Sequence, residues 1–321
     1  MNKSQWTAYL ELSGAAVLIG SSVVAGKITA LHLPVFFSQA VSLAAALLVL
    51  FPLTWRRRQE WLRLSRRDLL LLLLQAFLGM FLFRVLMLYG LQSASAVQAG
   101  ILTSLTPAAV ALLSVIFLKE RLTPRLVFGV LCAAVGAACI GAPGWLGTAS
   151  DAAAPASYAG LLLILAAVAG EAALTIIRKL TASSVSPLTG TTCVTLFSFL
   201  MFLPFSLAEA VRTDLSALRM EDAALMLYYG VFVTALAYLL WFSGVSKVSA
   251  STAAVYTGCI PVSTVLLSYT VLQEPFSWAH LIGGAFVIAG IRQVSVQSMA
   301  SPLPTDREPK GRRAAQPAAG K

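Results

Sequence analysis

Three ionisable side chains lie inside long apolar stretches of the sequence. Lys27 follows the run IGSSVVAG, Arg84 follows FLGMFLF, and Glu171 lies in the middle of AVAGEAALTIIRKL. Charges within a membrane span are costly, and they commonly mark the pathway of a substrate or an ion. A role in a translocation pathway is therefore our hypothesis for all three residues.

Each of these residues also has a simpler interpretation. The aliphatic stem of Lys27 could carry its ammonium to water at the end of a helix. Arg84 lies roughly 10 Å from the nearer helix end at 1.5 Å per residue, so it should face a cavity or a partner. Glu171 should be protonated, or should pair with a cation such as Arg84. A titrating Glu171 could couple proton movement to transport, and a fixed ion pair would be structural; the sequence leaves both open.

Further polar and aromatic residues occur in the apolar stretches around these charges. Aromatic rings can stack on planar solutes, although packing or anchoring at the membrane interface would account for them equally well. The candidates for the lining of a cavity are Gln98, Thr103, Tyr238, Trp241, Tyr256 and Thr257.

Catalysis, metal binding and nucleotide hydrolysis have little support in the sequence. The four cysteines form no CxxC pair and the two histidines are far apart. The chain has no GxxxxGK[ST] phosphate loop. A membrane enzyme acting on lipid-linked substrates would need clustered His, Asp or Glu at one interface. We therefore expect no catalytic residues, no metal and no cofactor.

The composition indicates the elements that hold these residues. Hydrophobic residues make up 58% of the chain and charged residues 11%, whereas soluble domains carry roughly 25% charged residues. A helix needs about 20 mainly apolar residues to cross the bilayer. We predict an all-α integral membrane protein with ten transmembrane helices, over residues 12–31, 35–55, 68–91, 95–118, 124–142, 158–179, 187–208, 222–243, 249–272 and 278–296.

The basic residues indicate the orientation of these helices. Most of the 23 Lys and Arg residues fall in the loops on one side and in the tail, which places that side and both termini in the cytoplasm. The net charge of +10 therefore reflects topology, since no basic face or motif for nucleic acid is present. By the same reasoning we expect Glu11, Arg178 and Lys179 to lie at cytoplasmic interfaces. The predicted location is the cell membrane.

An internal repeat runs through the sequence. Residues 83–137 align without a gap on residues 237–291. Matches of Leu and Ala are expected between any two apolar helices, but matches of Gly, Pro and Glu are not. Those matches are Gly90/Gly244, Pro107/Pro261, Glu120/Glu274, Gly129/Gly283 and Gly136/Gly290.

Ten helices in two copies give five helices per copy, and this odd number makes the second copy run in the opposite direction. We therefore predict two inverted repeats, the arrangement of many secondary transporters, at residues 8–142 and 158–296. Residues 143–157 form an external linker and residues 297–321 a disordered, basic cytoplasmic tail.

Two features recur in both repeats. Pro107 and Pro261 should interrupt the fourth and ninth helices after their first turns, and Glu120 and Glu274 should end these helices and cap the ones that follow. The small residues of the fifth and tenth helices should serve as scaffold or dimer contacts. They are Gly129, Gly136, Gly283, Gly284 and Gly290.

The chain resembles the EamA branch of the drug/metabolite transporter superfamily. The likeness rests on Gly20 followed seven residues later by Lys27, and on the segments from Pro107 to Glu120 and from Pro261 to Glu274. Many members have a Trp where Ile19 stands and an Arg near Gln39. The resemblance implies the fold, and a transporter that usually exports amino acids, nucleosides or other metabolites.

We therefore expect a secondary transporter that exports a small organic solute, amino-acid-like or related, by alternating access. Its partners would be the solute, the bilayer and, if Glu171 titrates, protons; a homodimer stays open. The alternatives are a membrane-embedded enzyme and a scaffold that transports nothing.

Overall fold

The computed structural model describes residues 3–29, 34–93, 103, 105–120, 123–141, 158–211, 218–271 and 278–300. All regular structure within these ranges is helical. Four of the helices are long and apolar enough to cross a membrane, namely Val35–Trp55, Arg66–Met87, Pro187–Ala210 and Met220–Lys247. The structure thus confirms the prediction of an all-helical chain with apolar spans.

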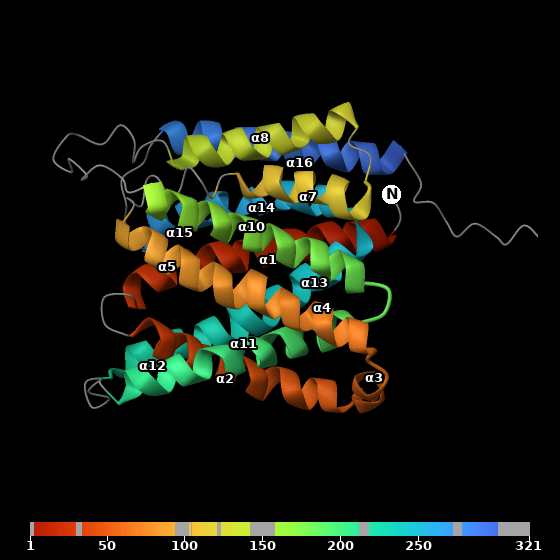
Figure 1. Cartoon of the computed structure of the whole chain (residues 1–321). Coiled ribbons are helices and arrows are strands. Elements are labelled where there is room, and N and C mark those ends of the chain that lie inside the picture. Colours follow the sequence, from red (N-terminus) through yellow and green to blue (C-terminus); the bar gives the residue numbers. More distant parts are fainter. Residues whose placement is uncertain are drawn as a thin grey trace, which may run out of the picture.

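The described helices follow one another in two similar series (Figure 1). The first comprises α1 (Lys3–Thr29), α2 (Val35–Trp55), α3 (Arg58–Leu62), α4 (Arg66–Ala76), η1 (Phe77–Leu82), α5 (Phe83–Ser93), α7 (Thr106–Leu118) and α8 (Pro124–Gly141). The second comprises α10 (Tyr158–Thr181), α11 (Pro187–Ala210), α12 (Met220–Tyr228), η3 (Tyr229–Ala237), α13 (Tyr238–Lys247), α14 (Ala250–Thr257), α15 (Cys259–Val271) and α16 (Trp278–Ala300).

Corresponding helices of the two series have corresponding neighbours. Helix α1 packs on α12, η3, α13 and α15 of the second series, and α10 packs on α4, η1, α5 and α7 of the first. The remaining helices meet their own counterparts, with α8 against α16 at one edge of the bundle and α2 against α11 at the opposite edge (Figure 1). The most extensive contacts of these six helices are therefore with the other series.

Glycines make the α8–α16 contact reciprocal. A Cβ atom at Gly136 would lie 2.6 Å from the carbonyl oxygen of Gly283, and one at Gly290 would lie 2.7 Å from that of Gly129. Gly136 and Gly290 occupy matching positions of the repeat, as do Gly129 and Gly283. These four glycines thus bring two backbones of the same chain together, which is the scaffold use of small residues in membrane helices.

Capping at the α2–α11 edge is reciprocal as well. Glu60, which follows α2, accepts a hydrogen bond from the backbone N–H of Ser186 at 2.7 Å, just before α11 begins. Glu209, in the last turn of α11, accepts one from the backbone N–H of Phe37 at 2.9 Å, in the first turn of α2. Each helix N-terminus has unpaired N–H donors, and each receives a carboxylate from the partner series.

The helices that the sequence predicts over residues 68–91 and 222–243 are not continuous α-helices in the structure. Each contains a π-helical segment, η1 in the first series and η3 in the second. Gly79 of η1 lies against Leu174 of α10, and Gly230 of η3 lies against the backbone of Ser42 in α2. π-Helical turns are rare and often occur at functional sites. Because they occur at the same place in both series, the residues next to them are candidates for a functional site.

The prolines of the repeat act slightly differently from our expectation. Helix α7 begins at Thr106, so Pro107 stands in its first turn, where a missing N–H is harmless. In the second series the break falls at Gly258, between α14 and α15, and Pro261 lies in the first turn of α15. A proline cannot donate to the carbonyl four residues before it and clashes with that carbonyl, which explains why the helix breaks ahead of Pro261.

Candidate functional site

The two π-helical segments lead directly into two residues that match in the repeat. Arg84 is the second residue of α5, after η1, and Tyr238 is the first residue of α13, after η3. The two side chains meet, since Arg84 forms a hydrogen bond with Tyr238. When residues at equivalent positions touch each other, they lie where the two halves of the molecule come together.

Glu171 is the third member of this group. Its Oε2 accepts a hydrogen bond of 3.0 Å from Oγ1 of Thr106, so α10 and α7 are joined at this point. The carboxylate also lies within electrostatic range of the Tyr238 hydroxyl, as does Tyr229. The structure therefore brings Arg84, Tyr238 and Glu171 together and adds Thr106, whose contribution sequence reasoning missed because a single threonine carries no signal.

Arg84 and Glu171 do not form the ion pair that was one of the alternatives for Glu171. The ion pair among the described residues joins Lys247 to Glu11, and Glu171 has Thr106 as its hydrogen-bond donor. Nη1 of Arg84 is buried without a hydrogen-bond partner. A buried donor without an acceptor is costly, roughly 1–3 kcal/mol and more for a charged group, so this nitrogen is suited to receive an acceptor from a bound molecule.

The neighbouring tyrosines tie this region to α1. Tyr229 donates its hydroxyl to the backbone oxygen of Ser22 at 2.7 Å, and the hydroxyl of Tyr228 lies 2.5 Å from Oγ of Ser21. Lys27 lies on the same helix, one and a half turns further on, but its side chain is outside the described part of the structure. These contacts fix the end of α12 and the start of η3 against the stretch of α1 that carries the Gly20–Lys27 pattern.

The other residues expected to line a cavity are divided between packing and local bonding. Trp241 and Tyr256 are 6% and 2% exposed and belong to one apolar core cluster, where Tyr256 stacks on Tyr9 with ring centroids 5.5 Å apart. Thr257 donates its hydroxyl to the carbonyl of Ala254 in its own helix at 2.6 Å. Thr103 is half-buried, and Gln98 lies outside the described residues.

Arg178 and Lys179 are not the interfacial residues that we expected. Arg178 is fully buried, donates to the carbonyls of Phe242 and Val185 at 3.1 Å each, and lies over the ring of Phe242. Lys179 donates to the carbonyls of Val245 and Val248. The carbonyl of Val245 belongs to the last turn of α13 and that of Val248 follows it, so Lys179 satisfies acceptors at a helix end, an effect that residue counts in loops do not reveal.

Glu120 caps a helix, but not the one that follows it. Its carboxylate accepts hydrogen bonds from the backbone N–H groups of Ala250 and Ser251 at 2.9 and 3.2 Å, and from the Ser251 hydroxyl at 2.6 Å. It therefore caps α14 of the second series, because the halves interlock at this end. Its repeat partner Glu274 lies outside the described residues, as does the side chain of Pro261.

A groove opens elsewhere, on the outer surface of α8 and α16. It is lined by Phe128, Ala285, Ile288, Ala289, Arg292 and Gln293. Aliphatic side chains around it, such as Leu131 and Ile282, are more than half exposed. This surface belongs to the apolar exterior of the bundle and not to the group around Arg84.

Comparison with known proteins identifies the class of this molecule. The model of the EamA-like transporter family matches the chain twice, over residues 6–142 and 158–296. The chain belongs to the EamA-like transporter family. It is accordingly a membrane transporter, and the resemblance inferred from the residues is confirmed.

Relatives of this EamA-like protein carry transporter names. It is 41% identical over 289 residues to the uncharacterized transporter YetK of Bacillus subtilis, covering 90% of this chain and 87% of that protein. It is 26% identical over 238 residues to a probable terminal-alkyne amino-acid exporter of Streptantibioticus cattleyicolor, with 73% and 75% covered. A solved crystal structure at 20% identity superposes with a TM-score of 0.75 over 91% of this chain and 98% of its own, which supports the fold alone.

Proposed function

We propose that this transporter exports a small organic solute by alternating access of two inverted five-helix halves in the cell membrane. The observation that carries the proposal is the group formed by Arg84, Tyr238, Glu171 and Thr106 between the two halves. It combines a cation with a free donor, an aromatic hydroxyl and a carboxyl group. Polar groups of this kind inside an apolar bundle are expensive unless something binds them.

The packing supports the inverted relation of the halves. The neighbours of α1 and α10 correspond, the glycine contacts of α8 and α16 are reciprocal, and so are the caps on α2 and α11. Reciprocal contacts are what a two-fold relation between two similar units produces. Two such halves can rock about a site between them and open it to either side.

The same group suggests the chemistry of the solute. The free donor of Arg84 suits a carboxylate, and Glu171 suits an ammonium group if it is ionised. The ring of Tyr238 offers an aromatic surface between them. An amino-acid-like solute presents both charges close together, and one relative bears the name of an amino-acid exporter. If Glu171 instead takes up a proton in each cycle, it couples export to a proton gradient.

The orientation follows from the basic residues. Arg56, Arg57, Arg58, Arg63, Arg66 and Arg67 are all exposed at the end of the bundle that carries α3. We place this end, which we call the basic end, at the cytoplasm together with both termini.

Flux of labelled amino acids in proteoliposomes tests the proposal. We expect saturable wild-type flux, a loss of about tenfold or more in Arg84→Gln and Glu171→Gln, and unchanged flux in Glu221→Gln, which alters an exposed carboxylate of α12. Unchanged flux in both Arg84→Gln and Glu171→Gln would show that these residues do not form the transport site. A rate of flux that is the same with and without an imposed pH gradient would contradict proton coupling, but it would not contradict export.

A further inference from the structure

Carboxylates of the first half hold the second half at the basic end of the bundle. Glu60 binds Ser186, Asp68 accepts a hydrogen bond of 2.6 Å from the hydroxyl of Ser184, and Glu120 binds the start of α14. The fourth is Glu11 of α1, which contacts α13. In this structure the two halves are therefore joined at their basic end.

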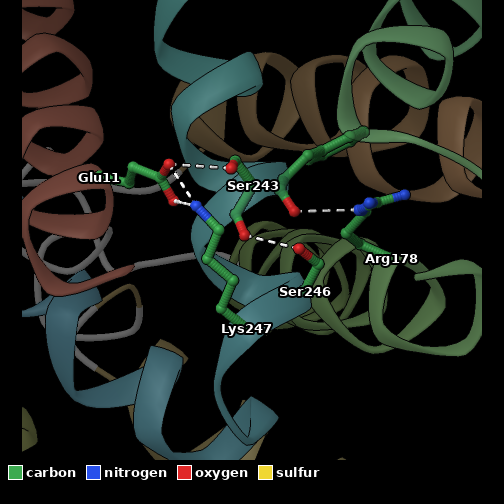
Figure 2. Close-up of polar contacts among 6 residues, drawn as sticks. Glu11, Arg178, Ser243, Ser246 and Lys247 are labelled. Atoms are coloured by element: carbon green, nitrogen blue, oxygen red, sulfur yellow. Dashed lines mark hydrogen bonds and ion pairs between the residues drawn. The ribbon is translucent and has the colours of Figure 1, made fainter. Parts of the chain in front are cut away.

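Glu11 makes a contact unlike the other three (Figure 2). Its Oε1 and Oε2 lie 2.5 and 2.7 Å from Nζ of Lys247, and Oε1 also accepts a hydrogen bond of 3.0 Å from the hydroxyl of Ser243. The side chains of Lys247 and Glu11 are 28% and 16% exposed, so water screens the pair only in part. Such a pair is stronger than a free surface salt bridge but still reachable from the solvent.

The second half holds its side of this contact rigidly. Nε of Arg178 donates to the carbonyl of Phe242 in α13 (Figure 2). Lys179 donates to the carbonyls of Val245 and Val248, so α10 holds the end of α13 in place. Lys247 is the last residue of α13. A movement of α1 relative to α13 must therefore separate Glu11 from Lys247, since α13 is fastened within its own half.

The contact can open without damage to either helix. Glu60 and Glu120 accept hydrogen bonds from backbone N–H groups at helix starts, so their loss exposes a helix end. Within the described part of the chain, Glu11 accepts its hydrogen bonds from side chains of α13, so both α1 and α13 keep their backbone hydrogen bonds when it leaves. Leu12 and Val248, which follow Glu11 and Lys247 in the chain, belong to one buried core cluster that also includes Ala253 of α14, so the pair lies at the border of this cluster.

We infer that the Glu11–Lys247 ion pair is the gate of the transport pathway at the basic end, closed in this structure and broken when the pathway opens to that side. This inference rests on the proposed alternating access. A ligand or a mutation acts on such an equilibrium only through a contact that differs between the two states, and this pair is such a contact.

Thiol labelling tests the gate without knowledge of the solute. In a background with Cys132, Cys139, Cys193 and Cys259 replaced by Ala, Ala253→Cys reports access to the core cluster that the pair borders. A membrane-impermeant maleimide is added to vesicles of each orientation. We expect slow labelling in this parent, and labelling from the basic end about tenfold faster after Glu11→Gln, a shift of about 1.4 kcal/mol toward the open state. The exchanged pair E11K/K247E should return the rate toward that of the parent.

Unchanged labelling in Glu11→Gln, or an exchanged pair that labels as fast as the single variant, would overturn the gate. A second arm links E11C to K247C by oxidation in the same cysteine-free background, without the reporter. Flux should stop in the linked protein and return on reduction, whereas continued flux through the linked protein would also overturn the gate. If every protein lacks flux while labelling behaves as expected, the gate stands and the proposed solute fails.

Discussion

Two corresponding helix crossings, which we call joints, are held together by different contacts: α1 on α15 and α10 on α7. Where α1 crosses α15, Gly20 lies directly on the backbone, and a Cβ atom there would be 2.7 Å from the carbonyl oxygen of Ile260. Where α10 crosses α7, Glu171 receives the hydroxyl of Thr106 instead. Thr106 and Ile260 are equivalent positions of the repeat. One joint is therefore a close backbone contact, beside which Ser263 donates a hydrogen bond of 3.2 Å to the carbonyl of Ala16, and the other is made by a pair of polar side chains.

A second difference lies at the meeting point of the halves, where Arg84 in one corresponds to Tyr238 in the other. The outer packing of α8 on α16 is symmetric, with the same glycines on both sides. Symmetry thus belongs to the scaffold, because both halves must interlock in the same way. Asymmetry lies at the centre, and under the proposed function a solute with different groups at its two ends needs different partners there.

The backbone joint at Gly20 should be the least tolerant of change. A Cβ atom in Gly20→Ala would overlap the side chain of Ser263 as well as approach the carbonyl of Ile260, so α1 must move away from α15. We expect a loss of about 3 kcal/mol of stability, measured as a lower midpoint of thermal unfolding in detergent. Gly14→Ala on the same helix meets only Leu240 at 3.6 Å and should be neutral or slightly stabilising. Equal midpoints for the two variants would contradict the close contact.

The symmetric joint should respond equally from both sides. Gly136→Ala and Gly290→Ala each push a methyl group onto a facing glycine carbonyl, at 2.6 and 2.7 Å, and should each cost about 1–3 kcal/mol. Gly284→Ala, whose Cβ meets nothing within 4 Å, is the control and should be neutral or stabilising. Thermal unfolding of the three variants measures this. A large effect in only one of the first two would break the equivalence of α8 and α16.

The cap that crosses between the halves should have a smaller effect. Glu120→Ala removes the acceptor for two backbone N–H groups and one hydroxyl at the start of α14, and we expect a loss of about 1–2 kcal/mol. Glu120→Gln keeps one acceptor and should lie between this variant and the wild type. Glu221→Ala, an exposed acidic residue in the first turn of α12, is the control and should cost only a few tenths of a kcal/mol. A cost for Glu120→Ala no larger than that of the control would mean that the cap is not used.

Much of this organisation is readable from the sequence, and the reasons are local. Apolar length marks the helices, and the matching Gly, Pro and Glu residues reveal the repeat. Arg84 and Glu171 stand out because charge is rare in apolar runs. Their expected role in the pathway remains a prediction.

The features that the sequence does not reveal are contacts that depend on which helices pack against one another. Nothing in the residues around Glu120 indicates that it caps α14 instead of the next helix. Nor does the sequence around Arg178 indicate that this side chain is buried over the ring of Phe242. The π-helical segments are equally hidden, since they depend on how Gly79 and Gly230 approach the neighbouring helices. Thr106 becomes significant only when α7 is placed beside Glu171.

The polar joint should show the smallest change in stability and the clearest change in function. Thr106→Val keeps the shape of the side chain but removes the donor to Glu171, at a cost of about 1 kcal/mol. Glu171→Gln keeps the shape of its partner and removes the charge. If the two residues act as one unit, flux in the double variant should equal that of Glu171→Gln alone, whereas independent residues would multiply their losses. A hydroxyl at the other crossing supplies the control: Ser263→Ala removes the hydrogen bond of 3.2 Å to the carbonyl of Ala16 and should leave flux unchanged, because the proposed binding group lies at the crossing with Glu171.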